Sequence, residues 1–395
     1  MIAINQMPIS FCSSPGFKYF MNVNDPNYKL CSAESVKNRL KLLTKWEVDK
    51  KISSIVTDNA ANVINAVSQL ELNDNMEKYG LTCAAHSLQL AVNKALLDDE
   101  IQRILTKSSK IVCHFKHSSI SMKSLEKTQQ KLNLPKLTLL QYYRNITASN
   151  IAQKLEITES EWLIIEKLLV LLKPLQALTT LFCGELESSV SMVRPLIHKI
   201  VTSHYEHGIE DDNITERFKN TILYQLTTRF ELTWKEIVTA RHVASFLNPR
   251  YKDMEHEPVS AREKIRSHVL QLIESVAPTI TNPNDTEEND LKMNNVLAFI
   301  YKDHTNSTND AFTQFTGYLS EPQLRFDLNP LEWWRTREEK YPAIATIAKK
   351  YLAIPSTSAS SERCFSTAGN IVTPKRSCLL PENVDMLVFL YQNRK

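Results

Sequence analysis

The chain has 395 residues, of which 43% are hydrophobic and 23% are charged, and these are the values of a globular protein with one large or two ordinary domains. Its formal net charge of +3 is too small to indicate a nucleic-acid binder by itself. With six glycines and no GxGxxG or P-loop pattern, a nucleotide-binding fold built on glycine turns is a poor candidate, and a mostly helical chain is favoured.

Seven cysteines are scattered without a CxxC pair, which is typical of a reducing compartment rather than of a disulfide framework. The first residues lack a basic segment followed by an apolar one, so no signal peptide is expected. The longest apolar stretch, residues 162–178, contains three charged residues and is interrupted by Pro174, which favours a buried helix over a membrane span. We therefore expect a soluble nuclear or cytosolic protein.

The first hundred residues contain turns, one predicted strand and three predicted helices. Residues 1–45 are predicted to be an irregular lead-in followed by a helix that Ser32 caps. Ile52–Val56 is a short apolar run and is predicted to be a buried strand. Apolar spacing then predicts a helix over Ala60–Leu70 and, after a turn, another helix that begins at about Ala84.

Residues 103–136 are locally basic, with Arg103 and seven lysines against Glu126 as the single acid. A solvated helix face is the more common explanation of such a run. A surface that faces nucleic-acid phosphates is the alternative, and the sequence leaves both open.

The middle of the chain, residues 158–275, is predicted to be helical. Thr158 is followed three residues later by Glu161, which is typical of a helix N-terminus, and apolar residues then recur at helical spacing. Residues 276–292 are polar and rich in Pro, Asn and Asp, so a disordered linker is predicted there.

The C-terminal part is the most regularly patterned. Trp333 and Trp334 are interpreted as packing anchors. The next helix has one apolar face formed by Ile344, Ile347, Ala348 and Tyr351. A Ser/Thr loop then leads into a helix that is predicted to end at Gly369. The last helix begins at Pro381 and is apolar nearly all round, so it must be buried inside the chain or against a partner.

Two acidic residues raise the question of metal-dependent chemistry. Asp58 follows the predicted strand, and Glu362 lies in the first turn of a predicted helix. Cleavage of a phosphodiester with two metal ions needs carboxylates from separate segments, and Mg²⁺ prefers such oxygen ligands. Each acid also has a simpler interpretation, since Asp58 would cap the next helix and Glu362 would suit a helix dipole.

The order of the motifs resembles the hAT transposase superfamily. The stretches IVTDNAANV (55–63) and CAAHSLQLAV (83–92) are followed by a long helical segment and then by PSTSASSERCFSTAGNIV (355–372) and PENVDMLVFL (381–390). The chain looks most like the transposase-derived group that carries BED zinc fingers. The resemblance runs from about residue 8 to 395 and includes the family's C-terminal dimerisation region.

The resemblance implies an α-rich α/β fold in which an all-helical insertion domain splits a partial RNase H-like catalytic domain. After the lead-in, residues 46–140 would form the first half of the RNase H-like domain, and residues 141–320 the insertion domain with its linker. Residues 321–395 would be the C-terminal dimerisation region and would complete the RNase H-like domain. Dimer contacts are expected from Val384, Leu387, Val388, Phe389, Leu390 and Tyr391.

The family cuts DNA with a D-D-E triad, and the resemblance implies that Asp58 is its second aspartate and Glu362 its glutamate. Cys83 and His86 match a CxxH motif that lies near the DNA in the family. The DNA-binding candidates are therefore Cys83, His86, Arg144, Arg363, Lys375 and Arg376.

Three departures from the family pattern bear on function. The segment that would hold the first aspartate is absent, and neither Asp25 nor Asp49 resembles a strand-end ligand, so we regard the N-terminal part as truncated. A TRWNS-like stretch keeps Arg144 and Asn145 without the tryptophan between them. No N-terminal zinc finger pattern occurs.

We therefore predict a domesticated or degenerate hAT transposase-like nuclear protein that dimerises and binds DNA and is not an enzyme, because a triad without its first acid lacks the geometry for metal-dependent cleavage. Its partner would be a second copy or a related hAT protein, with no membrane and no small-molecule substrate. The alternative is an active transposase with a substitute acid.

No resident metal is predicted, and Mg²⁺ would be needed only if catalysis is retained. A structural zinc site is a further hypothesis, because Cys83 and His86, and Cys113 and His117, have ligand-like spacing.

Overall fold

The computed structural model describes residues 53–58, 80–131, 133, 157–184, 189–209, 211–276, 311–372 and 379–393. The predictions made for residues 1–45, for the helix of residues 60–70 and for a linker after Val276 lie outside the described residues.

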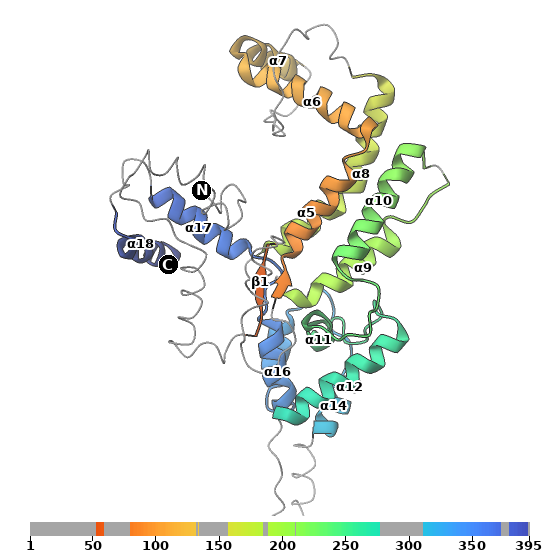
Figure 1. The fold of residues 1–395 in the computed structure, drawn as a ribbon, viewed down its shortest axis with the longest axis vertical. Coiled ribbons are helices and arrows are strands. Elements are labelled where there is room, and N and C mark those ends of the chain that lie inside the picture. Colours follow the sequence, from red (N-terminus) through yellow and green to blue (C-terminus); the bar gives the residue numbers. More distant parts are fainter. Residues whose placement is uncertain are drawn as a thin grey trace, which may run out of the picture. The chain divides into compact units, whose positions relative to one another are not determined.

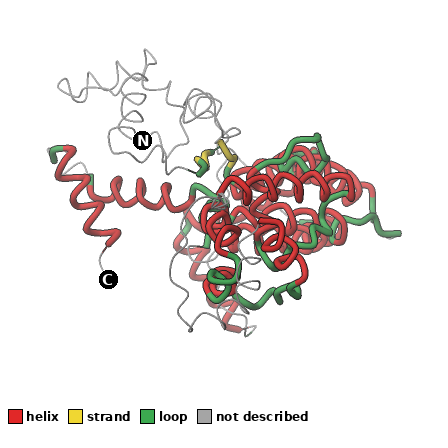
Figure 2. Tube along the Cα trace, turned by 90° about the horizontal axis from the view of Figure 1, so that it is seen from below, coloured by secondary structure: helices red, strands yellow, loops and turns green. Residues whose placement is uncertain are grey.

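The described part of the chain is mostly helical, with two short strands (Figure 1 and Figure 2). In chain order the elements are β1 (Ile55–Thr57), β2 (Gly80–Thr82), α5 (Ala84–Ala95), α6 (Asp99–His117), α7 (Ser119–Lys131), α8 (Glu159–Phe182), the 3₁₀ helix η3 (Val190–Met192), α9 (Val193–Ser203), α10 (Asn213–Arg229), α11 (Ala240–Leu247), α12 (Val259–Val276), α14 (Ala311–Ser320), α15 (Pro330–Arg335), α16 (Pro342–Leu352), α17 (Ala359–Ile371) and α18 (Pro381–Asn393). The α-rich character of the fold is thereby confirmed.

The chain forms two compact units. Unit 1 comprises residues 1–87, 178–199 and 230–395, and unit 2 comprises residues 88–177 and 200–229. The predicted domain boundaries near residues 140 and 320 rest on the family resemblance, and they stay a prediction.

The sheet of unit 1 consists, among the described residues, of β1 and β2 paired in parallel, with Val56 opposite Leu81. The strand predicted at Ile52–Val56 is present as Ile55–Thr57, and it is half-buried rather than buried. Parallel strands bring their carboxyl ends to the same edge, so the residues after β1 and β2 lie beside each other. A larger RNase H-like sheet stays a prediction.

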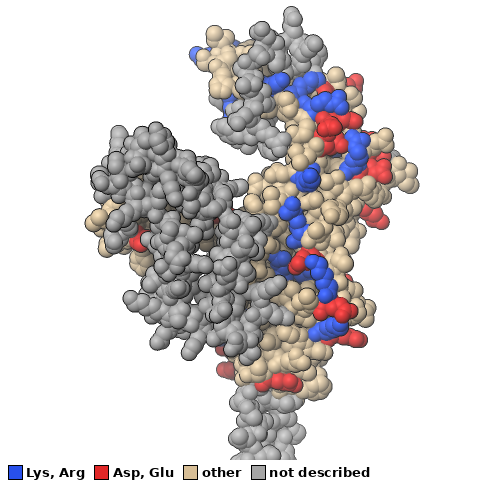
Figure 3. All heavy atoms as spheres, viewed as in Figure 1, with Lys and Arg blue, Asp and Glu red and all other residues tan. Residues whose placement is uncertain are grey.

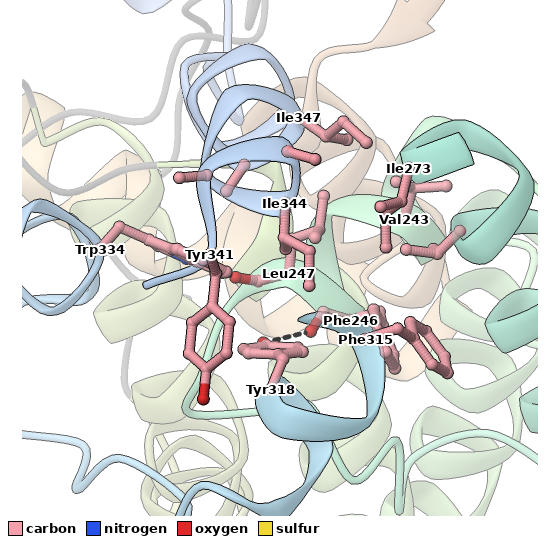
Figure 4. Close-up of a cluster of buried hydrophobic side chains, with 14 of the residues drawn as sticks. Val243, Phe246, Leu247, Ile273, Phe315, Tyr318, Trp334, Tyr341, Ile344 and Ile347 are labelled. Atoms are coloured by element: carbon pink, nitrogen blue, oxygen red, sulfur yellow. Dashed lines mark hydrogen bonds between the residues drawn. The ribbon is translucent and has the colours of Figure 1, made fainter. Parts of the chain in front are cut away.

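The main core of unit 1 is formed by α11, α12 and the helices α14, α15 and α16 (Figure 4). Ile344, Ile347 and Ala348 are buried on one face of α16, as their spacing predicts. Trp333 and Trp334 are also buried, and Trp334 Nε1 donates to the Leu247 carbonyl oxygen at 2.8 Å, which confirms their role as packing anchors. The Tyr318 hydroxyl donates to the Phe246 carbonyl oxygen at 2.7 Å, so the buried aromatic side chains of Trp334 and Tyr318 both have hydrogen-bond partners for their polar atoms.

A buried ion pair fixes α9 to the loops of unit 1. Arg194 and Glu257 are both almost fully buried, and the guanidinium donates to both carboxylate oxygens, at 2.6 and 2.9 Å. Arg194 also donates to the carbonyl oxygens of Phe230 and Glu231. Two buried charges are stable only when both are paired in this way, so the loss of one partner would be costly.

The predicted start of α8 after Thr158 is confirmed in unit 2. The Glu161 N–H donates to the Thr158 hydroxyl, and Glu161 accepts from the Thr158 N–H, which is a reciprocal capping box. The apolar stretch forms one helix that runs through Pro174, and it is buried along one face only, since Leu171 and Leu175 are buried whereas Leu169 is 62% exposed. A proline removes a single donor, and the remaining hydrogen bonds of this 24-residue helix hold it together.

In the part of the chain that the structure describes, no helix combines the length and the apolar character that a membrane span needs.

Candidate functional site

The carboxyl ends of β1 and β2 bring two predicted motifs together. Asp58 follows β1 and Cys83 follows β2, and the Cys83 N–H donates to the Thr57 carbonyl oxygen at 2.7 Å. The loop before α17 runs past this edge, because the Ala84 N–H donates to the Ser356 carbonyl oxygen at 3.0 Å and the Ser358 N–H lies 3.4 Å from Cys83 Sγ. The segments that carry Asp58, Cys83 and Glu362 thus meet at one sheet edge.

The loop is held in place by buried hydroxyl groups. Ser356 and Thr357 are buried, and both hydroxyls donate to the Phe182 carbonyl oxygen, at 2.9 and 3.2 Å. They tie the loop to the C-terminal end of α8, where helix carbonyls lack partners within the helix. A Ser/Thr-rich sequence therefore serves here to position the start of α17.

Glu362 lies in the first turn of α17, as predicted, and accepts from the Ser358 hydroxyl at 2.8 Å. Ser358 is the N-cap residue of this helix, so the glutamate is held by a residue four positions earlier. Arg363 Nη2 donates to the Cys183 carbonyl oxygen at 2.6 Å. Burial, together with the nearby Cys83, raises the pKa of the Cys183 thiol, which keeps this thiol protonated at neutral pH.

Carboxylates in this position suit a hard cation such as Mg²⁺. Among the described residues, however, no group of three or more His, Cys, Asp or Glu side chains is placed to hold a metal ion. Asp58 and Glu362 therefore do not form a complete triad with a third described acid. The four residues of the zinc hypothesis, Cys83, His86, Cys113 and His117, are all described and do not form such a group, so the structure gives that hypothesis no support.

Of the predicted DNA-binding residues, three are described. Cys83 is buried, and His86 is half-buried in the first turn of α5, which begins at Ala84 as predicted. Arg363 is exposed at the start of α17. Arg144, Lys375 and Arg376 lie outside the described residues. The DNA-binding roles of all six stay predictions.

Arg241 was missed from the sequence. It is buried on α11, and its Nη2 donates to the carbonyl oxygen and to the hydroxyl of Thr82, at 2.8 and 2.9 Å. Burial lowers its pKa to about 10, so it stays cationic at neutral pH. Arg241 thereby fixes Thr82, the last residue of β2, next to Cys83 at the carboxyl end of the strand. An arginine inside the apolar segment ARHVASFL was the available signal, because buried arginines are almost always paired.

The C-terminal helices of unit 1 differ from its core. Helices α17 and α18 contact each other, and α17 has no buried residue. Gly369 does not end α17, contrary to prediction: the helix continues to Ile371, and no described glycine has the positive φ of a helix-ending glycine. On α18, Phe389 is 65% and Leu390 57% exposed, Met386, Leu387 and Tyr391 are also exposed, and Val384 and Val388 are half-buried.

Within the part of the chain that the structure describes, the large apolar side chains of the last helix are exposed, so this part does not provide the burial predicted for it. Contiguous exposed apolar side chains are typical of interaction surfaces. Residues 314–394, which contain most of α14 and all of α15 to α18, match the hAT family C-terminal dimerisation region.

Relatives of known description extend the match over most of the chain. A Zea mays protein named as an AC transposase is 26% identical over 88% of this chain and 49% of its own length. A Zea mays protein named as an AC9 transposase is 32% identical over 41% of this chain and 22% of its own length. The human zinc finger BED domain-containing protein 4 is 21% identical over 87% of this chain and 31% of its own length.

The chain therefore spans half or less of the length of these relatives. Together, the matched C-terminal region and the relatives support an hAT transposase-derived protein, and residues 314–394 are its match to the hAT C-terminal dimerisation region.

Proposed function

We propose that this chain is a dimer-forming, DNA-binding protein of hAT origin that acts in the nucleus without cutting DNA. The observation that carries the proposal is the exposed apolar surface of α17 and α18 at the end of the matched dimerisation region. The partner is a second copy of the chain or a related hAT protein.

The dimer interface is assigned to the last helix. Phe389, Leu390 and Met386 are large apolar side chains exposed on adjacent turns of α18, and Phe365 is exposed on α17. Burial of such side chains against an equivalent surface gains roughly 1.5–3 kcal/mol for each of them. A C₂ dimer provides an equivalent surface on each copy, because its interface uses the same patch twice.

The absence of cleavage is proposed from the sheet edge. The family resemblance implies that Asp58 and Glu362 match two acids of the triad and that the segment for the first acid is missing. In-line displacement with two metal ions needs all the ligands in fixed geometry. In this chain we assign Ser358 and Glu362 the role of starting α17, and Asp58 that of ending β1.

Light scattering after size-exclusion chromatography of the full chain tests the dimer. We expect a mass of two chains for the wild type and of one chain for the variant Phe389→Gln/Leu390→Gln. The matched control is Phe312→Gln/Leu331→Gln, which removes two exposed apolar side chains from α14 and α15 and should leave the dimer intact. A wild-type monomer at all concentrations would contradict self-association and leave a related hAT protein as the partner to be tested by mixing.

A nicking assay with a supercoiled plasmid and Mg²⁺ or Mn²⁺ tests the absence of cleavage. We expect no nicking by the wild type above the level of Glu362→Gln. Nicking that this substitution abolishes would establish the alternative, an active transposase with a substitute acid.

A further inference from the structure

A basic surface on unit 2 lies on helices other than those assigned to the proposed dimer interface. From Lys110 to Lys131 the chain has five lysines, at positions 110, 116, 123, 127 and 131, against one acid, Glu126. These residues lie on the second half of α6 and on α7, which contact each other. Figure 3 shows Lys and Arg side chains on the visible face of these helices.

The lysines of α7 form a stripe along one side of the helix. Lys123, Lys127 and Lys131 are four residues apart, which places consecutive ammonium groups about 6 Å from each other along the axis. All three are exposed, whereas Met122, Leu125 and Gln129 are half-buried on another side. The stripe therefore points away from the side that packs.

Among the described residues of unit 2, other basic side chains pair with acids, whereas no ion pair includes these lysines. Lys107 pairs with Glu161 at 2.7 Å, Lys167 with Asp212 at 2.6 Å, and Lys219 with Asp211 at 2.6 Å. No ion pair between described residues includes any of the five lysines from Lys110 to Lys131. Their positive charge is thus available to a partner outside this part of the chain.

The side chains around the stripe indicate the kind of partner. Ser124, Thr128 and Gln130 are the exposed neighbours of the lysines on α7, and such groups commonly bond phosphate oxygens. The exposed side of α7 carries no aromatic ring on which an unpaired base could stack. Evenly spaced point charges without a stacking surface suit the backbone of a duplex, which presents phosphates at regular intervals.

We infer that the stripe Lys123–Lys127–Lys131 on α7, extended by Lys110 and Lys116 on α6, binds the phosphate backbone of duplex DNA without reading its sequence. This inference rests on the DNA-binding part of the proposed function. It assigns this role to residues of unit 2 that are not among the DNA-binding candidates named from the family resemblance.

Fluorescence anisotropy with a labelled mixed-sequence duplex of about 30 base pairs, at about 50 to 200 mM salt, tests the inference. The variant is Lys123→Gln/Lys127→Gln/Lys131→Gln in the full chain, since glutamine keeps the helix propensity of lysine. The control is Lys235→Gln/Lys264→Gln/Lys349→Gln, which makes the same change in net charge at lysines of unit 1 that pair with glutamates.

We expect the α7 variant to bind at least about tenfold more weakly and to lose about 2 to 3 from the slope of log K against log salt, since each phosphate contact contributes about 0.9. The control should stay within about twofold of the wild type. Equal losses in the two variants, or none in either, would overturn the α7 assignment while DNA binding itself stands.

Competition for the labelled duplex by a polyglutamate of matched charge identifies the partner class. If polyglutamate displaces the labelled duplex as efficiently as unlabelled duplex does, DNA is overturned as the partner. If the wild type fails to bind the duplex at the lowest salt, the DNA-binding part of the proposed function fails as well, whereas the dimer is measured independently by its mass.

Discussion

The dimerisation region has two halves that differ in where their apolar side chains lie. The core half, α14 to α16, buries Phe315, Tyr318, Trp334 and Ile344 in unit 1. The terminal helix pair, α17 and α18, exposes Phe365, Phe389 and Leu390.

This difference indicates two ways in which one stretch of sequence is stabilised. The core half gains its free energy inside the protomer, through apolar burial and hydrogen bonds that satisfy its polar atoms. The terminal helix pair exposes its large apolar side chains within the described part of the chain, and under the proposed function it gains free energy by burying them against a partner. Stability measurements should therefore respond to the first half, and association measurements to the second.

The largest expected effect is acid unfolding of the scaffold on which the core half packs. Burial, reinforced by the Arg194 guanidinium, lowers the pKa values of His242 and His256 to about 3. Their Nε2 atoms each lie 3.8 Å from Glu257 Oε1, but this carboxylate is already neutralised by Arg194. In the unfolded chain, histidine titrates near 6.5.

Because both histidines are neutral in the folded state, their stabilisation is fully present above about pH 6.5 and is lost as the pH falls towards 3, by up to about 1.4 kcal/mol per pH unit for each group. Urea unfolding between about pH 7 and 4 measures this loss. His117→Gln, at the exposed end of α6, should leave the dependence unchanged. A stability that is flat over this range would contradict the buried, neutral state of the two histidines.

The next largest effect is expected from Trp334→Ala, which should cost about 3–5 kcal/mol in the free energy of unfolding. The substitution leaves a cavity beside Tyr318 and Trp333 and removes the donor to the Leu247 carbonyl oxygen. Trp334→Phe keeps most of the ring and should lose less. A cost below about 1 kcal/mol for alanine would show that the core half is not stabilised by internal packing.

A smaller loss is expected from Tyr318→Phe. The buried hydroxyl donates to the Phe246 carbonyl oxygen, and its removal leaves that oxygen without this donor, at a cost of about 1–2 kcal/mol. Tyr224→Phe is the control, since Tyr224 is exposed on α10 and should stay within about 0.5 kcal/mol of the wild type. Chemical unfolding of both variants in parallel measures the difference, and equal values would argue against the buried hydrogen bond.

The smallest effect on the protomer is expected from Phe389→Gln/Leu390→Gln, whose unfolding free energy in dilute solution should lie within about 0.5 kcal/mol of the wild-type value. The two side chains contact solvent in the protomer, so their loss removes no internal packing. Thermal unfolding at low concentration checks this expectation. A large destabilisation there would place α18 in the protomer core and would remove the contrast between the two halves.

Local signals in the sequence predicted the local structure well. The start of α5 at Ala84, the capping box of Thr158 and Glu161, and the buried face of α16 each follow from spacing within one helix. The terminal helix was also predicted to begin at Pro381, as it does, but the sequence did not show which surface its apolar side chains pack against. These features depend on neighbours within a few residues, which the sequence displays directly.

Pairs between distant residues could not be predicted in the same way. Arg194 and Glu257 are 63 residues apart, and Arg241 and Thr82 are 159 apart, so no periodicity connects them. The meeting of the Asp58 and Glu362 segments at one edge came from the family resemblance, because neither residue alone indicates more than a helix cap. Where a local rule failed, as at Gly369, the surrounding helical hydrogen bonds outweighed the preference of one residue.

Hydrogen–deuterium exchange of the wild-type chain over a range of concentrations tests the contrast between the two halves most directly. We expect the amides of α14 to α16 to be protected at every concentration, and those of α18 to become protected only as the protein associates. The Phe389→Gln/Leu390→Gln variant should lose the protection of α18 alone. Protection of α18 that is the same in the monomer and at high concentration would contradict the account, since it would mean that this helix is buried without a partner.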